Sequence, residues 1–361
     1  MNIDIHLESN AVSLCVVSGK GGSGKTLVAT CMALGLASSD KRVLLIDADF
    51  GTGGLTYFLG FSTFRSTREG LSEYIIGQNP KIAPPISEPR SEAVDANPAI
   101  RNVRLLQVGE HTLVDEGRFF ADPAKMQNLI HMMRSSFDFI IIDCRGGIDE
   151  DSLAICEVVD KIILVVETDA AAIRSTQHLT EILSRGGYGK KIGGFILNKV
   201  MDDPSQLANA GRSLFRAEYL GAIPFDIRTI RSFIRGQLPS QYSLLSRHVF
   251  RALSKIFPDI PRLAEARVLS PSEFSTISLR NPFARQGNTV LLGLSIYLVA
   301  GYIGYNYINH RTVSSIDAYF LAGSFFLLVF GLSDYLKEQV GRLLSPLALI
   351  KLFRPGMSDS S

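Results

Sequence analysis

Residues 18–26 read Ser-Gly-Lys-Gly-Gly-Ser-Gly-Lys-Thr, and this short stretch decides the fold. The apolar run Val12–Val17 precedes it and Leu27–Leu36, with helical periodicity, follows it, so the context is strand, glycine-rich loop, helix. The glycines let successive N–H groups turn onto phosphate oxygens at the positive end of the helix dipole. Lys25 would reach the β and γ phosphates, and the Thr26 hydroxyl would hold Mg²⁺. The sequence therefore predicts a nucleoside triphosphate site rather than a glycine-rich turn that binds nothing.

Strand-like apolar runs alternate with helical stretches from residue 12 to about residue 257. The runs are continuous rather than alternating, which is typical of strands buried on both faces. We expect an α/β fold with a mainly parallel, doubly wound sheet of the P-loop NTPase kind. The predicted strands are Ser13–Ser18, Arg42–Asp47, Val103–Val108, Phe139–Asp143, Lys161–Glu167, Ile192–Leu197 and Ala222–Pro224.

Acidic and amide side chains follow three of these strands. Asp47 and Asp49 come at the end of the second predicted strand, and Asp143 ends the fourth. Ligands of parallel sheets bind at the carboxyl ends of the strands, and an acid in the position of Asp143 can hold Mg²⁺ through water there. Asn198 follows another strand, and its amide could bond the edge of a purine. For each residue the simpler interpretation is a solvated side chain at a strand end.

These motifs resemble those of the MinD/ParA-type ATPases. Lys-Gly-Gly-Ser-Gly-Lys-Thr at 20–26 looks like their deviant Walker A motif, Ile-Asp-Ala-Asp at 46–49 like their A′ motif, and Ile-Ile-Asp at 141–143 like their Walker B motif. The resemblance covers roughly residues 10–257. It implies a homodimer that closes face to face around two ATP molecules, with hydrolysis separating the protomers.

The resemblance also implies roles for individual residues. Lys20 would cross the interface to the partner's phosphates, Lys25 would act on the phosphates of its own nucleotide, and Asp49 would position or activate the attacking water. Thr26, Asp47 and Asp143 would support Mg²⁺ and its waters, while Asn198 and Pro224, within the segment 223–226, would flank the adenine. The expected nucleotide-binding residues are Gly19, Gly21, Gly22, Ser23, Gly24, Lys25, Thr26, Leu27, Asn198 and Pro224.

One part of the pattern departs from the family. Its members often have Ser or Thr and then Pro-Ala-Gly after the third acid, whereas this chain has Cys144-Arg145-Gly146-Gly147. The loop that moves with the γ-phosphate would therefore respond differently here, which bears on the catalytic rate.

Composition limits the other classes of site. The chain has 361 residues, a formal net charge of +2 and four cysteines, none in a C-x-x-C pair and none preceded by a secretory signal. Reduced, mostly buried thiols in a cytosolic domain are expected. The six histidines lack metal-ligand spacing, so we predict no zinc or other structural metal.

The apolar residues are concentrated after residue 288. Residues 289–308 contain no formal charge and are long enough to cross about 30 Å of hydrocarbon as a helix; residues 316–332 form a shorter apolar span. Basic residues flank the pair on both outer sides, so the positive-inside rule places both ends in the cytoplasm. A buried soluble hairpin is the alternative, but a second domain large enough to cover it is not evident.

These observations divide the chain into four parts. We expect a MinD/ParA-like ATPase domain at 1–257, a linker at 258–288, a transmembrane hairpin at 289–335 and a basic cytoplasmic tail at 336–361 that lies on the bilayer or in solvent. The protein would be a multi-pass protein of the inner (cytoplasmic) membrane, with the ATPase domain and both termini in the cytoplasm. The proline-rich segment 78–99 is expected to be a mobile surface loop.

The leading functional hypothesis is a membrane-anchored ATPase, slow without its partner, whose ATP-bound dimer recruits or positions an unidentified protein. The alternatives are a non-hydrolysing ATP-bound scaffold and a bacterial tyrosine kinase, although the tail after Tyr335 lacks the tyrosine cluster of such kinases. A nitrogenase-reductase-like iron–sulfur protein would need a cysteine within 80–110 to accompany Cys144, and none is present.

Residues 204–288 hold twelve Lys/Arg against five Asp/Glu. This basic belt could contact DNA, but lipid or solvent is favoured.

Overall fold

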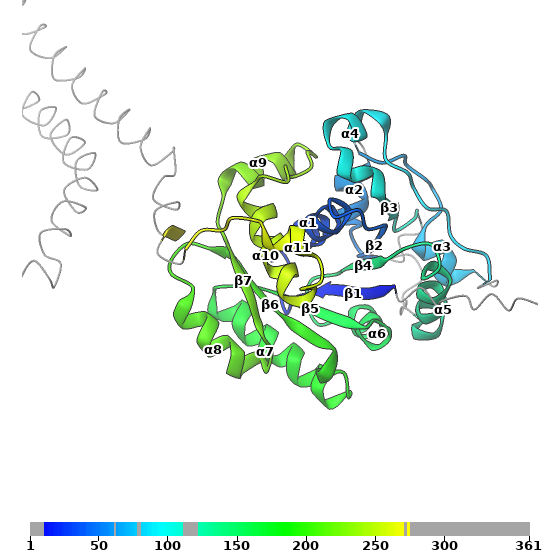
Figure 1. The fold of residues 1–361 in the computed structure, drawn as a ribbon. Coiled ribbons are helices and arrows are strands. Elements are labelled where there is room, and N and C mark those ends of the chain that lie inside the picture. Colours follow the sequence, from blue (N-terminus) through cyan, green and yellow to red (C-terminus); the bar gives the residue numbers. More distant parts are fainter. Residues whose placement is uncertain (1–10, 61–62, 78–80, 111–121, 271–272, 275–361) are drawn as a thin grey trace, which may run out of the picture. The chain divides into compact units, whose positions relative to one another are not determined.

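The computed structural model describes residues 11–60, 63–77, 81–110, 122–270 and 273–274 (Figure 1). All of them lie in the first of two compact units, which spans Met1–Ser278. Within the described ranges, every helix is too short or too polar to cross a bilayer. The predicted transmembrane hairpin at 289–335 and the tail at 336–361 lie outside the described residues, so both stay predictions.

The centre of the domain is a seven-stranded sheet in the order β3-β2-β4-β1-β5-β6-β7, and every neighbouring pair is parallel. The prediction of a mainly parallel sheet is confirmed, and each of the seven predicted strands exists. Strand ends differ by up to three residues, most at β6 and β7. The strands are β1 (Val12–Val17), β2 (Val43–Ala48), β3 (Val103–Leu106), β4 (Phe139–Cys144), β5 (Lys161–Glu167), β6 (Ile192–Val200) and β7 (Tyr219–Pro224).

Helices cover both faces of this sheet (Figure 1). One face packs against α1 (Lys25–Ala37), α2 (Gly54–Gly60), α4 (Ser91–Ala96), the 3-10 helix η1 (Pro98–Asn102), α10 (Leu244–Ile256) and α11 (Pro261–Ala264). The other face packs against α3 (Leu71–Ile76), α5 (Pro123–Met133), α6 (Glu150–Val158), α7 (Ala170–Arg185) and α8 (Ser205–Phe215). The remaining elements are the short 3-10 helix η3 (Gly189–Lys191) and α9 (Ile227–Ile234), which contains no buried residue.

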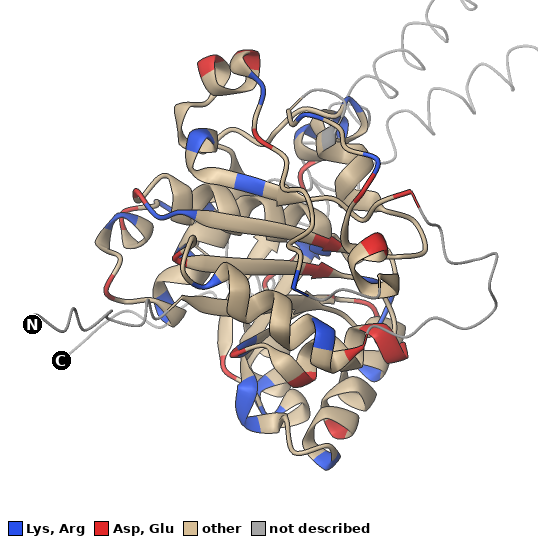
Figure 2. Ribbon diagram, turned by 90° about the vertical axis from the view of Figure 1, so that its right-hand side faces the viewer, with Lys and Arg blue, Asp and Glu red and all other residues tan. Residues whose placement is uncertain are grey.

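This double cover explains the continuous apolar sequences of the strands. All six residues of β2 and all six of β4 are buried, including the acids near their carboxyl ends. A side chain on either face of such a strand meets a helix layer rather than water, so an alternating pattern would leave polar groups in the core. Charged residues therefore lie mostly at strand ends and on helix surfaces, where Lys and Arg are interspersed with Asp and Glu (Figure 2).

Two predictions about irregular segments need correction. The described part of the supposed loop 78–99 contains α4, and Ser87 forms an antiparallel bridge to Leu105 of β3 through two backbone hydrogen bonds. The sequence did not indicate this, because a proline-rich segment lacks the apolar pattern of a strand even where it pairs with the edge of a sheet. The described part of the supposed linker contains α11, and Ile260, Leu263 and Phe274 are buried in the two hydrophobic cores.

His248 on α10 gives the domain a pH-dependent stability. Its ring lies in the core, where Nε2 accepts a hydrogen bond from the Leu269 backbone N–H at 3.3 Å. Burial lowers the pKa of His248 to about 4, from an ordinary value of about 6.5. Below pH 6.5 the histidine of the unfolded chain binds a proton, whereas the buried ring of the folded chain stays neutral. The free energy of unfolding therefore falls as the pH drops from 6.5 towards 4.

We therefore expect unsubstituted protein to lose about 3 kcal/mol of unfolding free energy between pH 7 and pH 4 through this residue. His248→Gln should lose less over the same interval, because an amide does not titrate. Urea unfolding of both proteins at the two pH values measures the difference. Equal losses in the two proteins would contradict the assignment.

Candidate nucleotide-binding site

The glycine-rich loop joins the carboxyl end of β1 to the first residue of α1. Gly24 directly precedes the helix with φ 87°, a left-handed conformation that favours glycine. A side chain at this position would also be obstructed, because an added Cβ would lie 2.5 Å from Nδ2 of Asn198. Gly24 thus joins the loop to the amino end of α1, where N–H groups without helical partners can bind an anion.

Lys25 is buried at the base of this loop, and its Nζ donates a hydrogen bond to the Ser18 hydroxyl at 3.1 Å. Burial lowers the pKa of Lys25, and the negative charge of nearby Asp143 opposes this effect. A buried ammonium group with one neutral hydrogen-bond acceptor retains capacity for further acceptors. Phosphate oxygens would supply them.

Two carboxylates lie side by side where β2 and β4 end, since Asp47 and Asp143 are partners in the parallel register. Both are buried, and burial raises the pKa of Asp47 to about 6 and that of Asp143 to about 7, with the charge of Asp47 as a further cause at Asp143. Asp47 accepts hydrogen bonds from the backbone N–H groups of Thr56 and Asp49 at 2.7 and 3.1 Å. Asp143 is less satisfied, because its Oδ1 is buried without a hydrogen-bond partner.

This orphaned oxygen tests whether the site fits Mg²⁺. A hydrogen bond between the Thr26 hydroxyl and Asp143 lowers the pKa of the acid, so the two predicted magnesium residues are adjacent. Carboxylate and hydroxyl oxygens are the ligands that Mg²⁺ prefers, and it binds through one or two of them together with waters and phosphates. Across the described part of the chain, no three His, Cys, Asp or Glu side chains are arranged to hold a metal by themselves. The donor set fits a magnesium ion delivered with a nucleotide.

Asp49, the predicted catalytic acid, caps its own turn. Its Oδ1 accepts hydrogen bonds from the backbone N–H groups of Gly51 and Thr52 at 3.2 and 3.1 Å, and its Oδ2 accepts one from the Thr52 hydroxyl at 2.5 Å. Each carboxylate oxygen has two lone-pair positions, so Oδ2 can accept a second proton donor, such as a water.

The loop after β4 lies directly on the phosphate loop. An added Cβ at Gly146 would lie 2.6 Å from Cα of Gly21 and 2.8 Å from Nζ of Lys25, so only glycine fits. The Gly147 N–H donates to the Ser18 carbonyl at 3.1 Å, and the Arg145 guanidinium lies beside Gly51. Residues 144–147, which differ from the pattern of the MinD/ParA family, therefore lie where a loop that responds to the γ-phosphate is expected.

Residues from the far half of the sheet complete the site. The Asn198 amide at the end of β6 donates to the Ser23 carbonyl at 2.7 Å, which gives it a role in the loop; its predicted contact with a purine stays a prediction. Pro224 is the buried last residue of β7. Gly19 lies against the backbone of Ser175 on α7, and Leu27 packs into the core beneath the loop.

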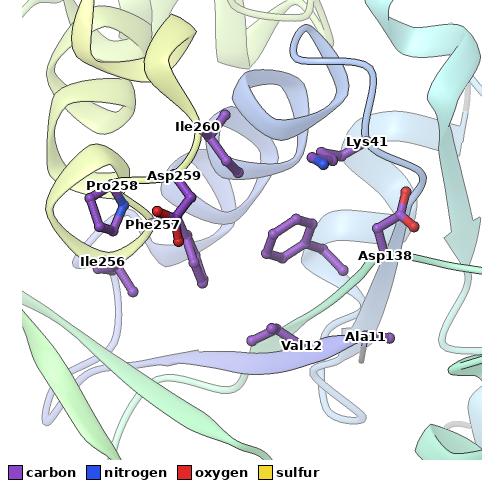
Figure 3. A pocket seen from close by; sticks show the side chains of 10 residues that line it. Ala11, Val12, Lys41, Asp138, Ile256, Phe257, Pro258, Asp259 and Ile260 are labelled. Carbon is purple, nitrogen blue, oxygen red and sulfur yellow. The ribbon is translucent and has the colours of Figure 1, made fainter. Parts of the chain in front are cut away.

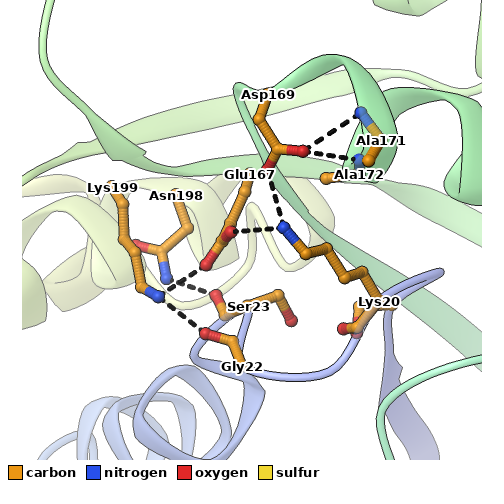
Figure 4. Close-up of polar contacts among 10 residues, drawn as sticks. Lys20, Gly22, Ser23, Glu167, Asp169, Ala171, Ala172, Asn198 and Lys199 are labelled. Atoms are coloured by element: carbon orange, nitrogen blue, oxygen red, sulfur yellow. Dashed lines mark hydrogen bonds and ion pairs between the residues drawn. The ribbon is translucent and has the colours of Figure 1, made fainter.

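Lys20 lies beside the acids that follow β5, and its side chain is 44% exposed. Its Nζ lies 3.2 Å from Oδ2 of Asp169 and 3.8 Å from Oε2 of Glu167 (Figure 4). Glu167 also pairs with Lys199. Sequence reasoning missed Glu167, Asp169 and Lys199, although two acids at the end of a predicted strand were the signal that had identified Asp47 and Asp49.

Other predicted features lie away from the loop. All four cysteines are free and buried, with Sγ of Cys15 3.7 Å from Sγ of Cys156. The basic belt is divided between helices, and two of its members serve packing: Arg251 donates to the Ala264 carbonyl and Lys255 to the Tyr219 carbonyl. A groove of about 400 Å³ lies at the amino ends of β1 and β4, beside Phe257, at the sheet edge opposite the phosphate loop (Figure 3).

Comparison with known proteins agrees with this geometry. Residues 12–186 match the model of a family described as an AAA domain. The septum site-determining protein MinD of Synechocystis sp. is 26% identical over 229 residues, covering 62% of this chain and 80% of that protein. A chain of the MinC:MinD cell division protein complex of Aquifex aeolicus has a TM-score of 0.54 at 20% identity, covering 72% of this chain and 98% of that chain. A ParA family ATPase of Chlorobium tepidum has a TM-score of 0.52 at 21% identity, covering 67% and 98%.

Fold and site together define a protein of the P-loop class, with a phosphate loop between the first strand and first helix of a parallel sheet. The chain is similar in sequence to MinD proteins, and it shares its fold with the Aquifex aeolicus complex chain and with the ParA family ATPase of Chlorobium tepidum.

Proposed function

We propose that this chain is a membrane-anchored ATPase that works as an ATP-dependent dimerisation switch and recruits or positions a partner protein. The observation that carries the proposal is the contrast between the two lysines of one loop. Lys25 is buried with its Nζ on the Ser18 hydroxyl, whereas Lys20 is exposed beside Asp169. A cation in that position can serve the nucleotide of a second subunit.

The residues of the site divide the work of binding ATP. The loop from Gly19 to Thr26 binds the phosphates, with Lys25 neutralising charge in a buried setting where electrostatic attraction is strong. Thr26, Asp47 and Asp143 would hold Mg²⁺, which would neutralise the developing charge on the phosphates. Binding of the cation favours the charged form of Asp143 and so offsets the cost of burying it.

Asp49 positions the attacking water. Its Oδ2 is already engaged by Thr52, and a water that donates to the same carboxylate would be held in a fixed orientation. The loop of Gly146 and Gly147 lies between this acid's turn and the phosphate loop, so a change there on phosphate release would reach the subunit interface.

The membrane part of the proposal comes from the sequence. The charge-free residues 289–308 and the apolar residues 316–332 would form two spanning helices, with the ATPase domain and both termini in the cytoplasm. Such an anchor does not leave the bilayer on the timescale of ATP turnover, so ATP would control pairing and partner choice at a fixed membrane address. In the Aquifex aeolicus complex, MinD is bound to the partner MinC.

Phosphate release by the detergent-solubilised full chain tests hydrolysis. We expect Asp49→Ala to lower the rate by about 100-fold or more, the usual contribution of a positioned acid or base. The matched control is Asp203→Ala, since Asp203 likewise caps its own turn, accepting from the Ser205 N–H at 2.8 Å, but lies outside the site. The proposal requires the control to release phosphate at the rate of the unsubstituted chain.

A non-hydrolysing scaffold is the second candidate, and the turn around Asp49 favours it, because three hydrogen bonds from that turn already engage the carboxylate and leave Oδ2 one further lone-pair position. A scaffold would bind ATP and pair, yet release phosphate at one background rate in the unsubstituted chain and in Asp49→Ala. That result would replace the switch with the scaffold.

A further inference from the structure

Two consecutive residues at the end of β6 hold two consecutive carbonyls of the phosphate loop. Asn198 Nδ2 donates to the Ser23 carbonyl at 2.7 Å, and Lys199 Nζ donates to the Gly22 carbonyl at 2.7 Å (Figure 4). These contacts join residues about 175 positions apart in the chain. They are the means by which the far half of the sheet fixes the shape of the loop.

Fixing a carbonyl also fixes an N–H group. The peptide bond is planar and trans, so its C=O and the N–H of the next residue point in opposite directions. When Lys199 holds the Gly22 carbonyl on one side, the Ser23 N–H is directed to the other side. Asn198 does the same for the Gly24 N–H through the Ser23 carbonyl. Both N–H groups belong to the loop that the glycines shape for phosphate.

Lys199 adopts an unfavourable backbone conformation to make this contact. Its φ is 56°, in the left-handed region that residues other than glycine seldom occupy, and only three such residues lie in the described part of the chain. Strain of this kind persists only where surrounding contacts compensate for it. Here the compensating contacts are those of Nζ with Gly22 and with Glu167.

Glu167 at the end of β5 is shared between two lysines. Its Oε1 lies 2.5 Å from Nζ of Lys199, and its Oε2 lies 3.8 Å from Nζ of Lys20. The Glu167 side chain is only 16% exposed, so water screens these charges less than at the surface. Asp169 gives Lys20 a second partner at 3.2 Å, but Lys199 has no other acid among the described ion pairs.

We infer that Lys199 and Glu167 are positioning residues of the phosphate loop, and that Glu167 links the loop to Lys20. This inference rests on the proposed function and deepens it. While Lys20 stays on its own subunit, it competes with Lys199 for the carboxylate. When Lys20 moves to the nucleotide of a second subunit, Glu167 is left to Lys199, whose hold on the Gly22 carbonyl becomes firmer. Pairing and tight phosphate binding thereby favour each other.

The test measures binding of Mg·ADP to the detergent-solubilised full chain by titration calorimetry, which needs no pairing. Lys199→Met should raise the dissociation constant about tenfold, and Glu167→Gln should raise it about threefold. The two residues act as a unit, so the double variant should resemble Lys199→Met alone. Lys199→Arg, which keeps the charge, should recover part of the affinity.

Lys191→Met is the matched control, because Lys191 also donates to a backbone carbonyl, that of Glu157, but lies away from the loop. It should bind Mg·ADP as the unsubstituted chain does. Unchanged affinity in Lys199→Met, or independent effects that multiply in the double variant, would overturn this inference alone. Absence of Mg·ADP binding by the unsubstituted chain would overturn the proposed function as well.

Discussion

Lys25→Ala is expected to weaken Mg·ATP binding by about 100-fold or more. The substitution removes a buried cation from a site built for phosphate, and a charge-assisted hydrogen bond in such a setting contributes about 3 kcal/mol. Titration calorimetry with Mg·ATP measures the change. Lys25→Ala should lower the affinity for the ligand and leave the stability of the fold unchanged. Burial already disfavours the charged form of this lysine and lowers its pKa, so the empty protein gains little from the charge.

Thermal unfolding without nucleotide provides the control for this prediction. Lys25→Ala should unfold at about the temperature of the unsubstituted chain, while added Mg·ATP should stabilise only the unsubstituted chain. If Mg·ATP raised the unfolding temperature of both proteins equally, the phosphates would not be bound at this loop.

Most of the fold could be predicted from the sequence because the signals were local and strong. Each buried strand carries a continuous apolar run, as in Phe139–Cys144. The glycine-rich loop directly follows the first of these runs, so it identifies the strand that leads into the phosphate site. Strand order in the sheet is not a local property. It depends on which helix layer each crossover joins, and here it places β1 between β4 and β5.

The acids of the site were predictable for a related reason. Asp47 and Asp143 each end an apolar run, and parallel strands bring their carboxyl ends to one edge, so the two positions had to be close. The sequence could not show that Asp143 has an unpartnered oxygen or that Asp49 caps its own turn, because both depend on the surrounding backbone.

Long-range polar contacts account for what was missed. Lys199 reaches the Gly22 carbonyl from the end of β6, where its backbone has a left-handed conformation. Segment 81–99 looked irregular because its proline content masks a short helix and a single bridge to β3. In both cases the contacts are with residues far away in the chain, and a local sequence pattern does not indicate such partners.

Lys20 has the largest expected effect on assembly. Among the described ion pairs of one subunit, it has the exposed pair with Asp169 and a longer contact with Glu167, and exposed ion pairs contribute little. Placed on the partner's phosphates, in an interface that excludes water, the same charge would gain much more. Truncating one member of a buried charge pair costs about 2–5 kcal/mol of association free energy. Lys20→Ala should therefore weaken pairing by about 100-fold or more.

Sedimentation of the detergent-solubilised full chain at saturating Mg·ATP tests the central claim most directly. Asp49→Ala should be used as the background, so that ATP persists during the run. We expect a dimer with Lys20 present and a monomer with Lys20→Ala, although both chains should still bind Mg·ADP. A dimer that forms equally well without Lys20, or a chain that stays monomeric with it, would contradict the account.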